Sequence, residues 1–531
     1  TDHARWNEAS PNGTPGTALS FSFMDAAPTY ASANETSTFA PMSAAQKQAV
    51  RDVLQLYREI AGVSFTEVAD AGAGGQLRFG TYLQTGTSTA AYAAAPSSSE
   101  RGGDVWVNRS STGYDTPVAG DYSFETLVHE IGHALGLKHP GAFKSDDQPP
   151  FLAAGVDNTQ YTLMSYNSRT DALFRDVTGA TAGDIHFINV SARTPMLYDV
   201  AAIQFIYGAN TATRSGNDSY TFDPSTPFFR TLWDGGGTDT ISVSNFTEAC
   251  IIDLRDGRYS SIRIVSDPLP PDFTGTEPTY FGADNLASAF GSIIENAAGG
   301  GGNDALTGND AGNRLDGGGG NDSLYGGAGN DTITGGAGND TIDGGSGTDI
   351  EVYSGNRAEH SITRNTDGSY TVRDQPAFIL PGGDGSDSLT NVERLQFSDM
   401  GLALDLAGNA GAVAKILGAV FGAGALANGQ WVGIGLSYVD AGMSYADLMQ
   451  LALGARLGAG YSDEAEIRLL YQNLLGISPT QTDIATWSGA IAAKQFTQAS
   501  LAVMAADTTL NAANIQLTGL AATGLDYFAA G

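Results

Sequence analysis

Residues 129–139 read His129-Glu-Ile-Gly-His133-Ala-Leu-Gly136-Leu-Lys-His139 and carry half of the six histidines of the chain. The apolar residues around them recur at the spacing of a buried helix: Leu127, Val128, Ile131, Ala134 and Leu135. On such a helix, His129 and His133 lie one turn apart on the same face. Gly136 can end the helix in a left-handed conformation, so that the chain turns and His139 swings back toward the other two histidines.

These three imidazoles predict one catalytic zinc ion. Three neutral histidines leave the fourth position of zinc open, whereas structural zinc sites are closed by a fourth protein ligand. Glu130 adjoins His129 and is the predicted general base, which takes a proton from the zinc-bound water and returns it to the leaving amine of a peptide. The alternative is that the histidines only pack and that Glu130 is a solvated charge. That alternative suits a bare two-histidine motif better than this extended one.

A second motif, Tyr161-Thr-Leu-Met164-Ser-Tyr166, follows about twenty-five residues after His139. A methionine in an apolar run is usually a core residue. Because it follows the three-histidine stretch, Met164 resembles the methionine of the turn that underlies the zinc in metzincins.

Six consecutive nine-residue units run from Gly299 to Val352, most with the pattern Gly-Gly-x-Gly-x-Asp-x-apolar-x, as in Gly326-Gly-Ala-Gly-Asn-Asp331-Thr-Ile333-Thr. The second unit has Asn313 in the Asp position. The glycines permit tight turns, and the single apolar residue of each unit stacks into a thin core. Turn carbonyls and aspartates are hard ligands for calcium, so a parallel β-roll that folds with several structural calcium ions is predicted. A flexible glycine linker would need neither the fixed Asp nor the fixed Leu or Ile.

Two outlying stretches extend this pattern, Asp234-Gly-Gly-Gly-Thr-Asp239 and Gly382-Gly-Asp-Gly-Ser-Asp387. The second is also compatible with an ordinary Asp-Gly turn, so two interpretations of it remain open.

The chain has 531 residues, too many for one hydrophobic core, and its composition divides it into three predicted domains. Residues 1–215 form an α/β (α+β) catalytic domain, 216–400 the β-roll, and 401–531 a helical domain. Predicted elements of the first domain are strands at 18–24, 63–68, 76–83 and 104–108, and a helix from the capping box of Ser43 and Gln46 to Gly62. In the last domain, helices are predicted over Ser444–Leu457 and Ser462–Leu475, in a small bundle for binding or assembly.

The charge balance restricts the partners. Fifty-eight acidic against twenty-six basic residues give a net charge of −32, which repels nucleic acids and anionic membranes and favours cations. No apolar run is long enough to span a bilayer. Cys250 is the single cysteine, so no intrachain disulfide forms and a buried structural thiol is expected. The start, Thr1-Asp-His-Ala, has neither Met nor a leader, and a processed form is expected.

Over roughly residues 15–355 the chain resembles the serralysin-type proteases, secreted bacterial metzincins with calcium-binding nonapeptide (RTX) repeats. The resemblance rests on motifs in the family's order: His129–Pro140, Met164–Tyr166, Asp199–Asn210, Trp233–Asp239 and Ile294–Gly300. It implies zinc ligation by His129, His133 and His139, with Glu130 as the catalytic carboxylate. It also implies that Tyr166 ligates zinc or swings to the oxyanion, and that Tyr92 to Pro96 forms the edge strand that pairs with substrate.

The same resemblance implies calcium ligands in two groups. Before the repeats these are Asp234, Gly236, Gly237, Asp239 and Glu295. Within the repeats they are Gly300, Gly302, Asp304, Asn313, Gly318, Gly320, Asp322, Gly327, Gly329, Asp331, Gly336, Gly338, Asp340, Gly345, Gly347 and Asp349.

The chain departs from the family in two places. Residues 220–230 lack the usual Arg-x-Asp-x-Thr calcium loop, so no ligands are expected there. Helical sequence continues where the family has its last strands and an uncleaved secretion signal, and residues 525–531 resemble such a signal only weakly. Secretion in one step, without a cleaved N-terminal signal, is the expectation. His3, His186 and His360 have no assigned role.

Two functions are therefore compared. The first is a secreted zinc endopeptidase (EC 3.4.24 class) that cuts extracellular proteins or peptides. The second is a calcium-repeat adhesion or surface-assembly protein whose helical domain binds an unknown partner. The first explains more residues. A metal-dependent amidase for small substrates is a weaker third, because open sheet edges near such sites favour extended peptides.

Overall fold

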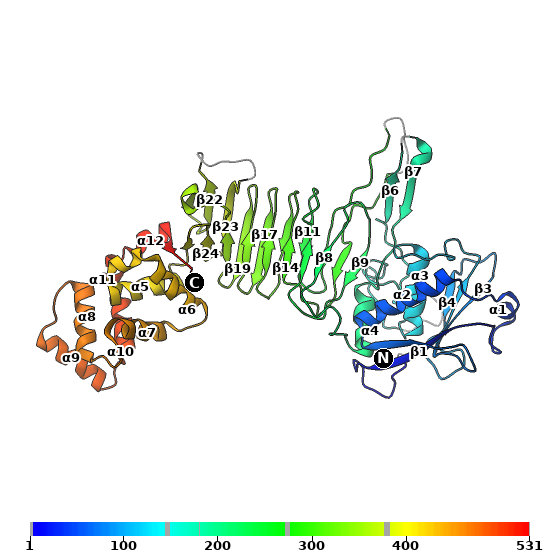
Figure 1. Cartoon of the computed structure of the whole chain (residues 1–531), viewed down its shortest axis with the longest axis horizontal. Coiled ribbons are helices and arrows are strands. Elements are labelled where there is room, and N and C mark those ends of the chain that lie inside the picture. Colours follow the sequence, from blue (N-terminus) through cyan, green and yellow to red (C-terminus); the bar gives the residue numbers. More distant parts are fainter. Residues whose placement is uncertain (1–3, 144–148, 180, 271–276, 376–382, 530–531) are drawn as a thin grey trace. The chain divides into compact units, whose positions relative to one another are not determined.

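The computed structural model describes residues 4–143, 149–179, 181–270, 277–375 and 383–529 (Figure 1). The chain divides into two compact units, Thr1–Asn296 and Ala297–Gly531, which are described separately. None of the helices in these described ranges has the length and hydropathy that a bilayer span requires.

A five-stranded sheet forms the framework of the first unit, with strand order β2-β1-β3-β5-β4. All neighbouring pairs are parallel except β4 and β5. β3 and β5 are buried along their whole length, as expected for central parallel strands. The bounds are β1 Thr17–Phe23, β2 Val63–Glu67, β3 Leu77–Tyr82, β4 Ala91–Ala93 and β5 Asp104–Asn108, so the four predicted strands are confirmed.

Helices α1 (Ala33–Thr38), α2 (Ala44–Ile60), α3 (Tyr122–Ala134) and α4 (Leu197–Tyr207) accompany this sheet. The capping box of Ser43 and Gln46 is present at the start of α2, as predicted. α2 ends at Ile60 with Ala61 as its C-cap, and Gly62 is required for another reason, since a Cβ there would lie 2.4 Å from Pro15 Cβ. Hydrogen bonds from α2 and α4 hold α3 in place. Tyr57 Oη of α2 donates to Val128 O (2.8 Å), and Tyr207 Oη of α4 donates to Leu135 O (2.7 Å).

The rest of the first unit consists of short strands. β6 (Leu173–Val177) and β7 (Ile185–Asn189) form an antiparallel pair, with the 3-10 turn η1 (Ala182–Asp184) before β7. β8 (Ser219–Thr221) pairs in parallel with β10 (Thr240–Ser242). β13 (Leu286–Ser288) lies between β9 (Arg230–Leu232) and β12 (Tyr259–Ser260), and β11 is Ile251–Asp253. Cys250 is buried, as predicted.

The repeats of the second unit form parallel strands that alternate between two sheets, the arrangement of a β-roll (Figure 1). One sheet contains β15 (Ala305–Thr307), β17 (Ser323–Ala328) and β19 (Thr341–Ser346), and the other contains β16 (Arg314–Asp316), β18 (Thr332–Thr334) and β20 (Ile350–Val352). Partners are eighteen residues apart, as in Leu306–Leu324 and Leu324–Ile342. β14 (Asn296–Ala298) falls on the boundary between the units.

The core position of the roll is apolar in five units and acidic in the sixth. Leu306, Leu315, Leu324, Ile333 and Ile342 are at most 2% exposed. Glu351 takes this position in the last unit, and its Oε1 accepts a hydrogen bond from Gly335 N (3.0 Å). Burial raises the pKa of Glu351 well above its usual value.

Both sheets of the roll continue beyond the repeats. One gains β23 (Ser386–Thr390), β22 (Tyr370–Asp374) and β21 (His360–Arg364), with the 3-10 turn η2 (Arg357–Glu359) before β21. The other gains β24 (Arg394–Gln396), β25 (Gly401–Ala403) and β26 (Leu525–Tyr527). The expectation that residues 401–531 are entirely helical is thus wrong at both ends, because β25 and β26 bury Leu402, Leu525 and Tyr527 as paired strands.

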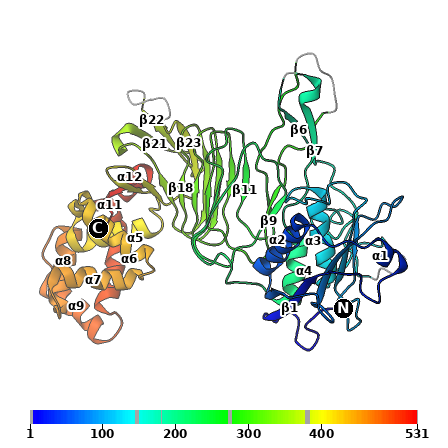
Figure 2. The same ribbon diagram turned by 45° about the vertical axis from the view of Figure 1, so that its right-hand side comes forward.

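Between β25 and β26 the chain is helical (Figure 2). The helices are α5 Asn409–Phe421, α6 Gly429–Asp440, α7 Tyr445–Leu457, α8 Asp463–Leu475, α9 Gln481–Ala492, α10 Gln498–Ala506, α11 Thr509–Asn514 and α12 Leu517–Thr523, with a 3-10 turn η3 at Ala423–Ala427. The two helices predicted from Ser444 and Ser462 are confirmed, with these serines as side-chain caps. A large core surrounds α5, and a smaller one gathers Ile467, Ile484 and Leu501.

Candidate metal centre

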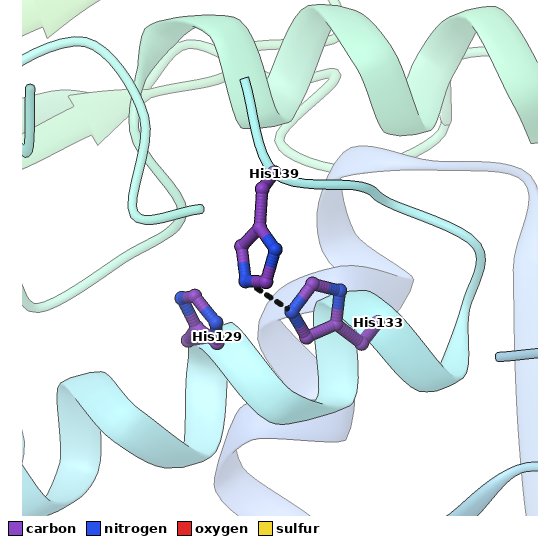
Figure 3. Close-up of side chains that lie close together, drawn as sticks. All are labelled: His129, His133 and His139. Atoms are coloured by element: carbon purple, nitrogen blue, oxygen red, sulfur yellow. Dashed lines mark hydrogen bonds between the residues drawn. The ribbon is translucent and has the colours of Figure 1, made fainter. Parts of the chain in front are cut away.

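Helix α3 and the turn after it bring three histidines together (Figure 3). One nitrogen from each of His129, His133 and His139 lies within 4.8 Å of the others. The turn depends on Gly136, which has φ +106°, and a Cβ there would lie only 2.4 Å from Ala4 O. Leu137 N then donates to Gly132 O (2.9 Å), which closes the end of the helix and directs His139 back over it.

Hydrogen bonds orient two of these rings. His129 Nδ1 lies 2.6 Å from Leu163 O, and His133 Nδ1 lies 2.8 Å from Leu137 O. A carbonyl oxygen only accepts, so each Nδ1 carries the proton and each Nε2 presents a lone pair. The Nε2 atoms of His133 and His139 are 3.0 Å apart, near the roughly 3.4 Å of two nitrogens on one tetrahedral zinc ion. The donor set fits zinc.

Asp199 of α4 supports this orientation; the sequence placed it in a motif of the resemblance but gave it no role. It accepts hydrogen bonds from Thr162 Oγ1 (2.5 Å) and Leu163 N (2.8 Å), and thereby fixes the carbonyl that contacts His129. Burial raises the pKa of Asp199 to about 6. Met164 is buried in the same turn. Its sulfur packs against α3 at Gly132, where a Cβ would lie only 3.1 Å from that sulfur.

Glu130 and Tyr166 line the same cleft as the histidines, with a volume of about 790 Å³. Glu130 is buried, whereas the Tyr166 side chain is 53% exposed. The Tyr166 ring stacks on His129 with centroids 5.7 Å apart, and its centroid is 4.6 Å from that of His139. Residues of the edge strand β4, among them Tyr92, form another wall of the cleft. The predicted base, phenol and edge strand therefore share one cavity.

Four of the repeat aspartates are buried and incompletely paired. Asp322, Asp331, Asp340 and Asp349 each accept a backbone N–H from eighteen residues earlier through one oxygen, as from Asp304 N to Asp322 Oδ1 (2.7 Å). Among the described residues, the other oxygen of Asp322, Asp331, Asp340 and Asp349 has no hydrogen-bond partner. Burial raises the pKa of Asp322 to about 7 and that of Asp331 to about 6. Buried carboxylates with an unused oxygen fit a bound cation.

The glycines of the repeats bring carbonyl groups close to these carboxylates. Positive φ angles occur at Gly318, Gly320, Gly327, Gly329, Gly336, Gly338, Gly345 and Gly347. Successive turns stack tightly, since a Cβ at Gly318 would lie 2.4 Å from Gly300 O and one at Gly320 would lie 2.2 Å from Gly302 O. Asn313 takes the Asp position of its unit, where its Oδ1 accepts from Asn309 N (2.7 Å).

A separate acidic group precedes the repeats. Oxygens of Asp218, Asp234 and Asp239 lie within 4.8 Å of one another, and Asp239 N donates to Glu295 Oε2 (2.8 Å). Gly236 and Gly237 have positive φ in the same turn. Asp218 was missed by the sequence reasoning, although the Gly216-Asn-Asp218 turn before β8 was a visible signal. The second outlying stretch of the repeat pattern begins at Gly382, which lies outside the described residues. His3 also lies outside them.

Comparisons with known proteins match parts of the chain to family models and to curated relatives. The family model for the RTX calcium-binding nonapeptide repeat matches residues 294–324 and 316–351, and that for the peptidase M10 serralysin C terminal matches residues 198–267. The chain is 34% identical over 296 residues to "Serralysin" of Proteus mirabilis, which covers 50% of this chain and 55% of the relative. This chain is a relative of the serralysins.

Two further relatives give the same result. "Metalloprotease AprA" of Pseudomonas entomophila is 33% identical over 330 residues, covering 59% of this chain and 62% of the relative. "Serralysin G" of Dickeya chrysanthemi is 33% identical over 317 residues, covering 56% of this chain and 60% of the relative. The chain thus spans little more than half the length of these curated relatives. The relatives and the donor sets together fit one zinc ion and several calcium ions.

Proposed function

We propose that this chain is a secreted zinc endopeptidase in which His129, His133 and His139 hold the metal and Glu130 is the general base. The observation that carries the proposal is the arrangement of the histidines, whose ligand atoms lie within 4.8 Å while carbonyl groups orient two of the rings. Three imidazoles with room for a further ligand are the donor set of a catalytic zinc ion rather than a structural one.

In this proposal, each residue of the cleft has one task. Zinc, when bound, polarises a peptide carbonyl and lowers the pKa of water toward about 7. The Glu130 carboxylate takes the proton of the attacking water and delivers it to the leaving amine nitrogen. Tyr166, at the open side of the cleft, would help to hold the metal or would donate its phenol proton to the oxyanion of the substrate.

Substrates of this site would be extended peptides. β4 is the last strand in the order of its sheet and lines the cleft, so a peptide can add to it as a further strand. Main-chain hydrogen bonds would then supply most of the binding, and the residues from Tyr92 to Pro96 would set the register of the scissile bond.

We extend the proposal to the whole chain as a catalytic part (1–215), a calcium-dependent roll (216–400) and a helical part (401–531). Buried carboxylates without a cation oppose folding, so the roll would fold after export, where calcium is abundant. Protein substrates follow from the protease assignment. The partner expected for the helical part stays a prediction.

Casein cleavage by wild type and by Glu130→Ala, both purified in calcium, tests the proposal. Loss of the general base should lower kcat/KM by about 10²- to 10⁴-fold while bound zinc stays at the wild-type level. Glu100→Gln, an exposed acid outside the cleft, is the matched control and should retain full activity. Undiminished cleavage by Glu130→Ala, or wild-type protein that binds no zinc, would contradict the proposal.

A further inference from the structure

A second group of metal-ligating side chains lies in the other unit, at His360. His360 begins β21, Asp374 ends β22, and Asp384 precedes β23. His360 Nε2 lies 3.3 Å from Asp374 Oδ1 and 3.1 Å from Asp384 Oδ2. The histidine is 3% exposed, so the three groups meet away from bulk water.

The other ring nitrogen determines what Nε2 presents to these carboxylates. His360 Nδ1 lies 3.0 Å from Asn356 O, which only accepts hydrogen bonds, so Nδ1 carries a proton. A neutral ring would then direct its Nε2 lone pair at two carboxylate oxygens. Three electron-rich atoms at these distances need a cation between them, either a proton or a metal ion.

Charge balance favours the metal ion. A proton on Nε2 supplies one positive charge against the two carboxylates, whereas a divalent ion supplies two. Further acids act on this end of the roll, since Asp340 and Asp387 join Asp384 in acting electrostatically on Glu351. Arg357, a nearby cation, donates to the His360 backbone oxygen (3.2 Å) and not to either carboxylate.

The carboxylates are also held in place from outside the group. Ser354 Oγ donates to Asp384 Oδ1 (2.9 Å), and Gly385 N donates to Asp374 Oδ2 (3.1 Å). The oxygens that face His360 are thereby directed at a common point. Such outer hydrogen bonds to a ligating imidazole and to ligating carboxylates are typical of metal centres.

We propose that His360 Nε2, Asp374 and Asp384 bind a second transition-metal ion, zinc or a similar divalent ion, that ties β21, β22 and the segment before β23 together. An imidazole with two carboxylates suits such ions, while calcium takes six to eight oxygen ligands. This site is independent of the protease proposal, since its ligands and its structural role are separate from the His129 centre.

Zinc counting on the calcium-saturated full chain, by mass spectrometry after dialysis, tests the proposal. Wild type should hold two zinc ions per chain, and His360→Gln and His133→Gln one each. The control His186→Gln, at an exposed histidine of β7, should keep two. An equal count in wild type and His133→Gln would count against the protease site alone. An equal count in wild type and His360→Gln would overturn the second site.

A milder variant covers the case in which His360→Gln does not fold. Ser354→Ala keeps all three ligands and removes the hydrogen bonds from Ser354 Oγ to both oxygens of Asp384, so the affinity of the second ion should fall about 10- to 100-fold. Cobalt titration, followed through its visible absorption in a His133→Gln background, measures that affinity. One cobalt ion with weakened binding in Ser354→Ala supports the site, and absence of cobalt binding in this background refutes it.

Discussion

The repeat roll (299–352) and the helical region (409–523) of the same unit derive their stability from different sources. Each repeat contributes one apolar residue to the core and leaves a carboxylate oxygen without a partner in four of the described units. The helical region buries a wide apolar core around α5. One region therefore depends on a bound cation, and the other depends on the burial of its own side chains.

Local structure shows the same contrast. Positive-φ glycines define every turn of the later repeats, which makes the unfolded chain unusually flexible and folding costly. In the helical region, side chains cap the helices that begin after Ser444, Ser462, Thr480, Thr497 and Thr508. Capping satisfies the first backbone N–H groups without any ligand. Calcium should thus control one region and leave the other unaffected.

Selective removal of calcium tests this contrast most strongly. A chelator that spares zinc should abolish hydrogen-exchange protection over residues 299–352, because unscreened buried carboxylates then oppose folding. Protection over 409–523 should persist, as measured by mass spectrometry with and without chelator. Equal loss in both regions would show that they share one source of stability.

Truncation of a core residue should lower the free energy of unfolding of either region by a similar amount, but added calcium should restore the stability of the roll alone. Leu453→Ala in α7 should lower the free energy of unfolding of the helical region by about 3 kcal/mol, at any calcium concentration. Ile333→Ala in the roll should be rescued by raising calcium, since a ligand of the folded state restores stability by mass action. Urea unfolding at two calcium concentrations measures both, and rescue of Leu453→Ala would break the contrast.

The helical region contains one acid that should make it sensitive to pH. Glu466 of α8 is fully buried, neither carboxyl oxygen has a partner among the described residues, and burial, with Asp463, raises its pKa to about 8. Because the folded pKa exceeds the unfolded value, stability is full at acid pH and falls as pH rises through about 8. The slope is at most about 1.4 kcal/mol per pH unit.

Replacing Glu466 tests whether this carboxyl group causes the predicted fall in stability as pH rises. Glu466→Gln should flatten the dependence of urea unfolding on pH between about 5 and 8. The control Glu464→Gln removes an exposed ion pair with Arg468 on the same helix and should leave the slope unchanged. A slope that persists in Glu466→Gln would place its origin elsewhere.

The smallest effect is expected from the irregular repeat. Asn313→Asp adds a carboxylate to the one unit that lacks it, so the calcium midpoint of folding should fall by less than about tenfold. At low calcium the variant should be less stable, because the hydrogen bond from Asn313 Nδ2 to Asn309 Oδ1 (3.1 Å) is lost. Circular dichroism during calcium titration measures both, with Asn365→Asp outside the repeats as control. An unchanged midpoint would mean that this position does not contact calcium.

Sequence reasoning succeeded where the relevant contacts are local. The spacing of His129 and His133, the capping box of Ser43 and the nine-residue period of the roll all follow from helix and repeat geometry. It also identified Gly136 as the residue that allows His139 to return, and the structure gives that glycine a positive φ. Within one or two turns, backbone geometry restricts where side chains point.

It failed where distant segments meet. Asp199 lies thirty-six positions after the Leu163 amide that it fixes, Asp218 meets Asp239 across a segment that contains β8 and β9, and His360 meets Asp384 twenty-four positions away. β26 pairs with β25 across the whole helical region. The sequence by itself determined the local chemistry of the zinc helix and the repeats. Only the tertiary structure decided which distant groups support them, because packing of the whole unit, and no local spacing, sets those contacts.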